Sequence, residues 1–201
     1  MDLEIHKNAW PDYILDMLDD KIQSFLSGNL EVATNRWPED VVQWSPHTLL
    51  YHFQPETEEH SELKNIVLKK WNVDTKTTCS ECLAPKEFIH FEFLLHFMPT
   101  GSYMPWHNDK HHKFVATTYL NKEWDWNWGG AFLWVDKNGE NKFLMPEYNT
   151  ATRYGKEKDT EGISHSVSKI INLPAKHYRI SLQTFWSLLW LKRKLQQQIH
   201  H

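Results

Sequence analysis

The chain has 201 residues, of which 40% are hydrophobic and 24% are charged, which is the composition of a globular protein rather than a disordered one. Its net charge of −4 argues against a general binder of nucleic-acid phosphates, which should be basic. No run of about 18 apolar residues is present, so we expect no membrane-spanning helix. The polar start argues against a secretory signal, and cytoplasmic localisation is therefore expected. Cys79 and Cys82 form a lone CxxC and are expected to be loop thiols in a reducing compartment rather than half of a zinc site.

Two helices are expected in the first part of the chain. Pro11 suits a first helical position, apolar residues recur at helical spacing from Ile14 to Phe25, and Gly28 can end the helix. A second helix is expected from about Glu58 to Trp71, because its apolar residues lie on one face.

From Phe88 the pattern changes to that of short strands. The run 88–97 is rich in aromatic residues, too short for a typical helix, and partly alternating, which is typical of a strand. Further strands are expected at residues 114–120, 131–135, 142–144, 149–154, 165–170 and 178–185, with a turn at 136–139. Helices followed by many short strands favour an α+β chain built on a β-sandwich or jelly roll. We expect a single domain over 1–201, with a helical and mixed part (1–87), a sheet core (88–186) and a closing helix (187–201).

Three residues are candidates for a metal site. His107 and Asp109 are two positions apart, so their side chains point to the same face of a strand or of its extended end. His165, from a distant strand, would complete the 2-His-1-carboxylate facial triad, which leaves open positions and suits non-haem Fe(II) oxygen chemistry. The chain has 13 histidines, so a single HxD pair is weak evidence. The order HxD, isolated His, then Arg179 on the last strand is more specific, because a guanidinium can hold an acidic co-substrate.

This order of motifs resembles that of the Fe(II)/2-oxoglutarate-dependent dioxygenases, and among them the prolyl 4-hydroxylases. The likeness extends over residues 88–186. Four segments carry it: Gly101 to Asp109 resembles the first iron motif, Tyr119-Leu120-Asn121 with Trp124 and Gly129-Gly130 resembles the "YLN…W…GG" segment, His165-Ser166-Val167 resembles the second iron motif, and Arg179-Ile180-Ser181 resembles the co-substrate motif.

The resemblance implies a double-stranded β-helix (jelly roll) with the N-terminal helices packed on one sheet. It also implies hydroxylation of an unactivated C–H bond, first of all in a prolyl residue of a peptide or protein, with release of succinate and CO₂. The implied cofactor and co-substrates are Fe(II), 2-oxoglutarate and O₂, with ascorbate as a candidate reductant. The implied iron ligands are His107, Asp109 and His165, and the implied 2-oxoglutarate residues are Arg179, Tyr119 and Ser181. Where the family often has a tyrosine ahead of the glycine-containing turn, this chain has Phe97, so one polar contact near the co-substrate is missing or relocated.

The 11 tryptophans leave alternatives open. They are either large core residues or an aromatic wall around a substrate. The candidates for such a wall are Trp106, Trp124, Trp128 and Trp186. A hydroxylase of a free amino acid or small metabolite is one alternative function. A Trp-rich β-sandwich that binds a carbohydrate or a partner without catalysis is another, and it would need neither the metal motif nor Arg179. The sequence does not define an oligomeric state.

Overall fold

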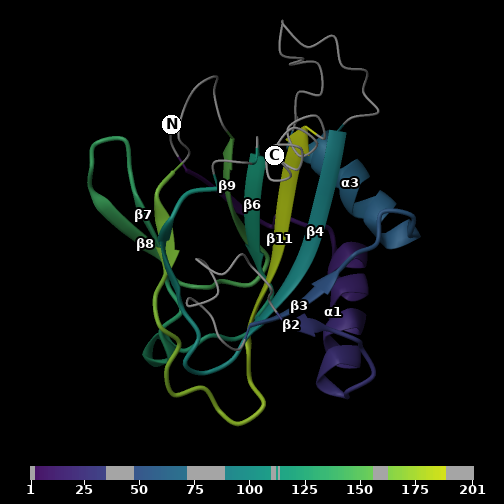
Figure 1. The fold of residues 1–201 in the computed structure, drawn as a ribbon, viewed down its shortest axis with the longest axis horizontal. Helices are drawn as coiled ribbons and strands as arrows, with labels where there is room; N and C mark the ends of the chain where they lie inside the picture. Colours follow the sequence, from purple (N-terminus) through teal and green to yellow (C-terminus); the bar gives the residue numbers. More distant parts are fainter. Residues whose placement is uncertain are drawn as a thin grey trace, which may run out of the picture.

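A computed structural model describes residues 3–34, 48–71, 89–109, 112, 114–155 and 163–188. Two antiparallel sheets and two α-helices, α1 (Asp12–Leu26) and α3 (Glu58–Lys70), make up most of this part (Figure 1). The larger sheet has the order β1 (Glu4–Lys7), β9 (Thr150–Gly155), β6 (Phe114–Tyr119), β11 (Arg179–Leu188), β4 (Ile89–Met98), β3 (Leu49–His52) and β2 (Ala33–Thr34). The smaller sheet has the order β5 (Met104–His107), β10 (His165–Val167), β7 (Phe132–Val135) and β8 (Asn141–Leu144).

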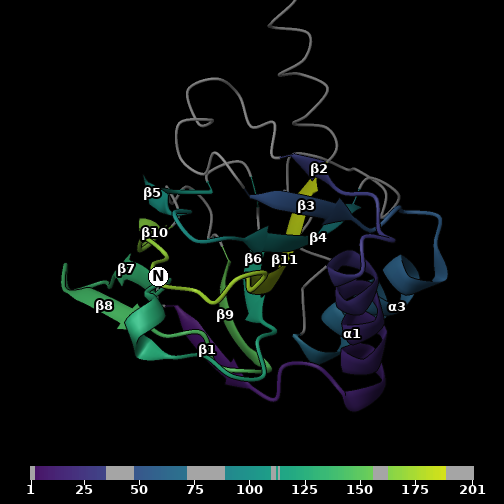
Figure 2. The same cartoon turned by 90° about the horizontal axis from the view of Figure 1, so that it is seen from below.

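From β4 onward the chain passes back and forth between the two sheets. Strands β4, β6, β9 and β11 belong to the larger sheet, and β5, β7, β8 and β10 belong to the smaller one. This alternation is the topology of a jelly roll. The smaller sheet faces one side of the larger sheet, and the two helices lie on the other side of the larger sheet (Figure 2). The predicted α+β double-stranded β-helix is thus confirmed.

The helices form where they were predicted, for identifiable reasons. One face of α1 buries Ile14, Leu18 and neighbouring apolar residues against the sheet. The hydroxyl of Thr57 caps α3 by accepting a hydrogen bond from the backbone N–H of His60 at 3.3 Å. Acidic residues in the first turn of α3 and lysines in its last turn suit the helix dipole.

Strand β11 separates the two sides of the larger sheet. Ile180, Leu182 and Trp186 belong to the core beneath the helices. Phe185, one position from Trp186, belongs to the core between the sheets. Because side chains alternate along a strand, Arg179 and Ser181 share the inward side with Phe185.

Several boundaries differ from the sequence prediction. Strands β1, β2 and β3, which have two to four residues each, were not predicted. The predicted closing helix is wrong at its start, since Ser187 and Leu188 continue β11. Residues 189–201 lie outside the described residues, as do Cys79 and Cys82. A helix long and apolar enough to cross a bilayer does not occur in the part of the chain that the structure describes.

Candidate metal centre

The three predicted metal ligands meet between the sheets. His107 ends β5, Asp109 follows two residues later, and His165 opens β10, where it is the cross-strand partner of His107. One donor atom from each residue lies within 4.8 Å of the others. The Asp109 carboxylate is 3.8 Å from Nε2 of His107 and 3.5 Å from Nε2 of His165. Metal bonds of about 2.0–2.2 Å place neighbouring ligand atoms roughly 3–3.5 Å apart, so only small movements would close this set on an ion.

Backbone carbonyls fix the tautomer of both imidazoles. Nδ1 of His107 donates to the carbonyl of Pro105 at 2.8 Å, and Nδ1 of His165 donates to the carbonyl of Ile163 at 2.9 Å. A carbonyl can only accept, so each Nδ1 carries a proton and Nε2 keeps the lone pair used for metal binding. Burial lowers the pKa of His165, which favours this neutral form.

Tyr154 of β9 supports the carboxylate. Its hydroxyl donates to Oδ2 of Asp109 at 2.5 Å and lies 3.5 Å from the ring nitrogens of His165. Burial and the neighbouring Asp109 charge raise the pKa of Tyr154 well above its usual value, so it remains a donor. Sequence reasoning placed Tyr154 on a strand and gave it no role. Its pairing with inward-facing Val115 of β6 explains why it points at the site.

Arg179 is a buried cation that is only partly satisfied. Arg179 is 1% exposed. Its Nε donates to the carbonyl of Gly130 at 2.9 Å, Nη1 reaches Sδ of Met98 at 3.7 Å, and the guanidinium lies 5.2 Å from the centre of the Tyr119 ring. Among the described residues, Nη2 of Arg179 and the hydroxyl of Tyr119 have no hydrogen-bond partner, and no carboxylate forms an ion pair with this arginine. A buried charge without a counter-ion is costly, and a guanidinium fork fits a carboxylate, so these groups could hold an acidic ligand.

The Gly129-Gly130 motif explains how Arg179 is held. Both glycines have positive φ, at +69° and +70°. A Cβ on Gly129 would lie 2.2 Å from the carbonyl oxygen of Lys169, and one on Gly130 would lie 3.0 Å from Cδ of Arg179. The motif therefore lets the backbone pass close to Arg179 and present the carbonyl that binds Nε.

Ser181, the remaining co-substrate candidate, and Phe97, which stands where the family often has a tyrosine, lie on opposite sides of the sheet. Ser181 is fully buried beside Arg179 on the inward side, and its hydroxyl accepts from Nε2 of Gln183 at 3.2 Å. Phe97 instead faces the helices, where its ring stacks on Phe25 with centroids 3.8 Å apart. The inward-facing neighbours of Phe97 on β4 are Met98, which contacts Arg179, and His96.

The four candidate substrate tryptophans are not one wall. Trp106 is 48% exposed and directly precedes His107. Trp124 and Trp128 are partly buried and pack edge to face with centroids 5.3 Å apart, and Nε1 of Trp124 donates to the carbonyl of Gly129. Trp186 is 7% exposed within the core beneath the helices. The structure therefore does not place Trp186 with the metal ligands, because it lies on the other face of β11.

Comparison with known proteins supports the fold. No protein-family model and no curated protein sequence matches the chain. Among solved structures, a prolyl-4-hydroxylase of Pseudomonas putida has a TM-score of 0.66 and 14% identity and covers 92% of each chain. A Trichoplax adhaerens prolyl hydroxylase, in complex with a hypoxia inducible factor oxygen degradation domain peptide fragment, has a TM-score of 0.69 and 12% identity, over 96% of this chain and 86% of that one. HygX of Streptomyces hygroscopicus, with nickel and 2-oxoglutarate bound, has a TM-score of 0.60 and 9% identity, over 92% of this chain and 82% of that one.

Proposed function

We propose that this chain, which has the fold of the 2-oxoglutarate- and Fe(II)-dependent oxygenases, is an Fe(II)- and 2-oxoglutarate-dependent dioxygenase that hydroxylates an unactivated C–H bond. The observation that carries the proposal is the pairing of two sites between the same two sheets. One is the cluster of His107, Asp109 and His165, and the other is the buried cation Arg179. A β-sandwich that only binds sugars or partners would have no use for either.

The donor set fits iron. Two neutral imidazoles and one carboxylate are the ligands of the facial triad, and three protein ligands leave positions for a co-substrate and O₂. Iron in this site would supply the oxygen chemistry in which 2-oxoglutarate and O₂ become succinate and CO₂ while one oxygen atom enters the substrate C–H bond. Asp109 fills the position that an alanine or glycine would leave open to a halide, so hydroxylation is favoured over halogenation.

Residues of the chain then act by binding and positioning. Arg179 binds the distal carboxylate of 2-oxoglutarate, and the hydroxyls of Tyr119 and Ser181 lie beside it on the inward face. Tyr154 holds one oxygen of Asp109. The ring of Phe132 stacks on His165 with centroids 5.4 Å apart and shields that side of the site from water.

The proposed substrate is a prolyl residue in a peptide or protein. Two of the three solved structures described above are prolyl hydroxylases, one of them in complex with a peptide fragment. The exposed Trp106 beside His107 offers an apolar surface for such a ring. A free amino acid or small metabolite is the second candidate, and fold likeness alone does not decide between them.

The test is succinate formation by the Fe(II)-loaded protein with prolyl peptides and with free amino acids. We expect the wild type to turn over 2-oxoglutarate, and His107→Ala or Asp109→Ala to abolish succinate formation. His6→Ala is the matched control, because the His6 ring pairs with Glu4 on edge strand β1. Wild-type turnover in either triad variant would remove the assignment. Preference for a free amino acid over every peptide would reject the prolyl-peptide substrate.

A further inference from the structure

A row of four polar side chains crosses the larger sheet beside Arg179. His96 of β4 is the cross-strand partner of Ser181, Ser181 is the partner of Tyr119, and Tyr119 is the partner of Thr150. Directly paired residues point to the same side of a sheet, so all four face the space between the sheets. All are at most 2% exposed. The row therefore forms a polar band within an otherwise largely apolar interior.

Most of this band lacks hydrogen bonds. In the described part of the chain, neither ring nitrogen of His96 has a partner, and the same is true of the hydroxyls of Tyr119 and Thr150 and of Nη2 of Arg179. Buried polar atoms are nearly always paired in folded proteins, and leaving one unpaired is unfavourable. These unpaired atoms lie on the same face of the sheet as the Arg179 guanidinium, so the band has free donors and acceptors to offer a polar ligand.

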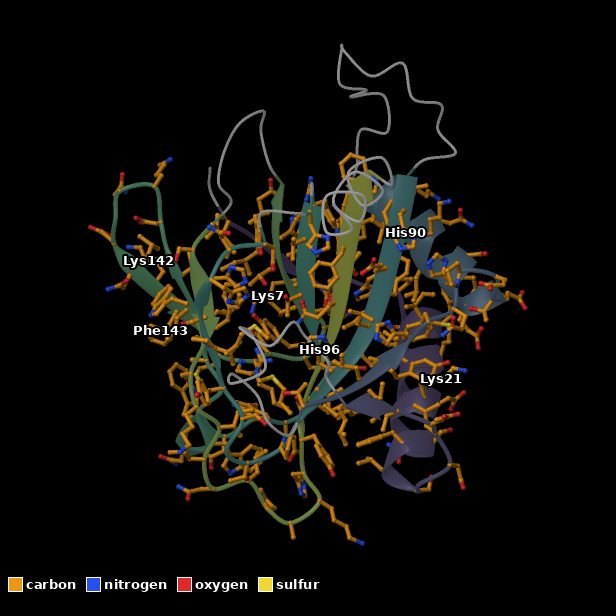
Figure 3. All side chains as sticks on the ribbon, viewed as in Figure 1. Lys7, Lys21, His90, His96, Lys142 and Phe143 are labelled. Atoms are coloured by element: carbon orange, nitrogen blue, oxygen red, sulfur yellow. The ribbon has the colours of Figure 1, made fainter. Side chains whose placement is uncertain are left out.

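His96 differs from a histidine that only supports the fold. The buried His60 of α3 shows the structural case, because its Nε2 bonds to the carbonyl of Phe91 at 3.2 Å. His96 makes no such bond to any residue that the structure describes, although it is the more deeply buried of the two. It lies toward one end of β4, and the partly exposed His90 lies near the other end (Figure 3).

The charge state of His96 suits an anion that Arg179 already neutralises. Burial, with the positive charge of Arg179 and a smaller effect of His52, lowers the pKa of His96 to about 3, while Asp109 acts in the opposite direction. The ring is therefore neutral and offers one N–H donor and one acceptor nitrogen. A neutral donor adds a hydrogen bond without placing a second positive charge beside the guanidinium.

We propose that His96 is a further co-substrate-binding residue, whose imidazole N–H donates to the carboxylate of 2-oxoglutarate that Arg179 binds. The inference rests on the proposed function and adds a residue to it. A carboxylate accepts about four hydrogen bonds. Arg179, Tyr119 and His96 lie on three neighbouring strands and share the inward face of the sheet, and together they offer donors for most of these bonds.

The test is calorimetric titration of 2-oxoglutarate into the Mn(II)-loaded protein, which binds the ligand without turnover. We expect His96→Leu to raise the Kd for 2-oxoglutarate roughly 10- to 150-fold, the range for a lost hydrogen bond to a charged group. His96→Gln, which keeps a donor, should lose less. Oxalate chelates the metal and has no distal carboxylate, so its Kd should stay at the wild-type value in both variants.

Thermal unfolding without ligand separates binding from folding. His96→Leu should keep or raise the Tm, because it removes an unpaired buried ring. The control His60→Leu should lower the Tm, because it breaks a made hydrogen bond, and should leave the Kd for 2-oxoglutarate unchanged. Wild-type affinity for 2-oxoglutarate in His96→Leu, or an equal loss for oxalate, would overturn the role of His96 alone. A wild-type protein that does not bind 2-oxoglutarate would overturn both this inference and the proposed function.

Discussion

Replacing Gly130 by alanine should damage the site through Arg179 rather than through the backbone alone. Gly130 has φ of +70°, where an L residue costs about 1–2 kcal/mol. The added Cβ would also lie 3.0 Å from Cδ of Arg179, 3.1 Å from Cζ2 of Trp124 and 3.2 Å from Cγ1 of Ile170. Such crowding in a packed interior costs about 1–3 kcal/mol. The total destabilisation expected for Gly130→Ala is therefore about 2–5 kcal/mol.

Gly139→Ala is the matched control, because it imposes similar strain without crowding. Gly139 has φ of +78° in the turn between β7 and β8, and nothing lies within 4 Å of its added Cβ. Only the backbone cost of about 1–2 kcal/mol is expected there. The two variants should thus differ by about 1–3 kcal/mol, or roughly 2–12 °C in Tm for a chain of this length.

The affinity for 2-oxoglutarate gives the second measurement. A displaced Arg179 loses its alignment with the carboxylate, so Gly130→Ala should raise the Kd of the Mn(II)-loaded protein by at least roughly tenfold. Gly139→Ala should keep the wild-type Kd. Equal Tm losses in the two variants together with unchanged Kd values would refute the view that Gly130 positions Arg179.

Three further predictions concern single side chains. Tyr154→Phe removes the hydrogen bond to Asp109 and should weaken Mn(II) binding about 10- to 100-fold by calorimetry; an unchanged affinity would mean that this contact does not support the metal site. Arg179→Lys replaces a fork by a point charge and should raise the 2-oxoglutarate concentration needed for half-maximal turnover at least roughly tenfold, so a normal requirement would contradict its role. His96 has a pKa of about 3 when folded, against about 6.5 when unfolded, so the unfolded state binds the extra proton between these values. The free energy of unfolding should therefore be at its full value above pH 6.5 and fall toward pH 3, with His96 contributing up to about 1.4 kcal/mol per pH unit. In denaturant melts, His96→Leu should show a shallower fall of this free energy with pH. Identical pH slopes in the two proteins would mean that His96 is not buried in its neutral form.

The parts of the site that depend on local spacing could be predicted from the sequence. His107 and Asp109 share a face because they are two residues apart, and their side chains meet as expected. The residues that depend on register were not predictable in this way. A shift of one residue turns every side chain of a strand to the other face, and register becomes known only once strands are paired.

Three residues illustrate this limit. At Phe97 the resemblance implied a polar contact near the co-substrate that is missing or relocated; the pairing of β4 with β11 turns Phe97 toward the helices and brings His96 inward. Trp186 was predicted as part of an aromatic wall around the substrate, yet it lies one position from the inward Phe185 and so faces away. Short edge strands such as β2 carry too few residues for any periodicity to be read.

The two halves of the proposed site come from different sheets. The histidines belong to strands of the smaller sheet, whereas Arg179 belongs to the larger one and reaches across to the carbonyl of Gly130, just before β7. A dicarboxylate that joins the metal to Arg179 would link the two sheets of the jelly roll. Occupancy of the site would then oppose their separation, and saturating co-substrate would make the protein harder to unfold according to its affinity and concentration.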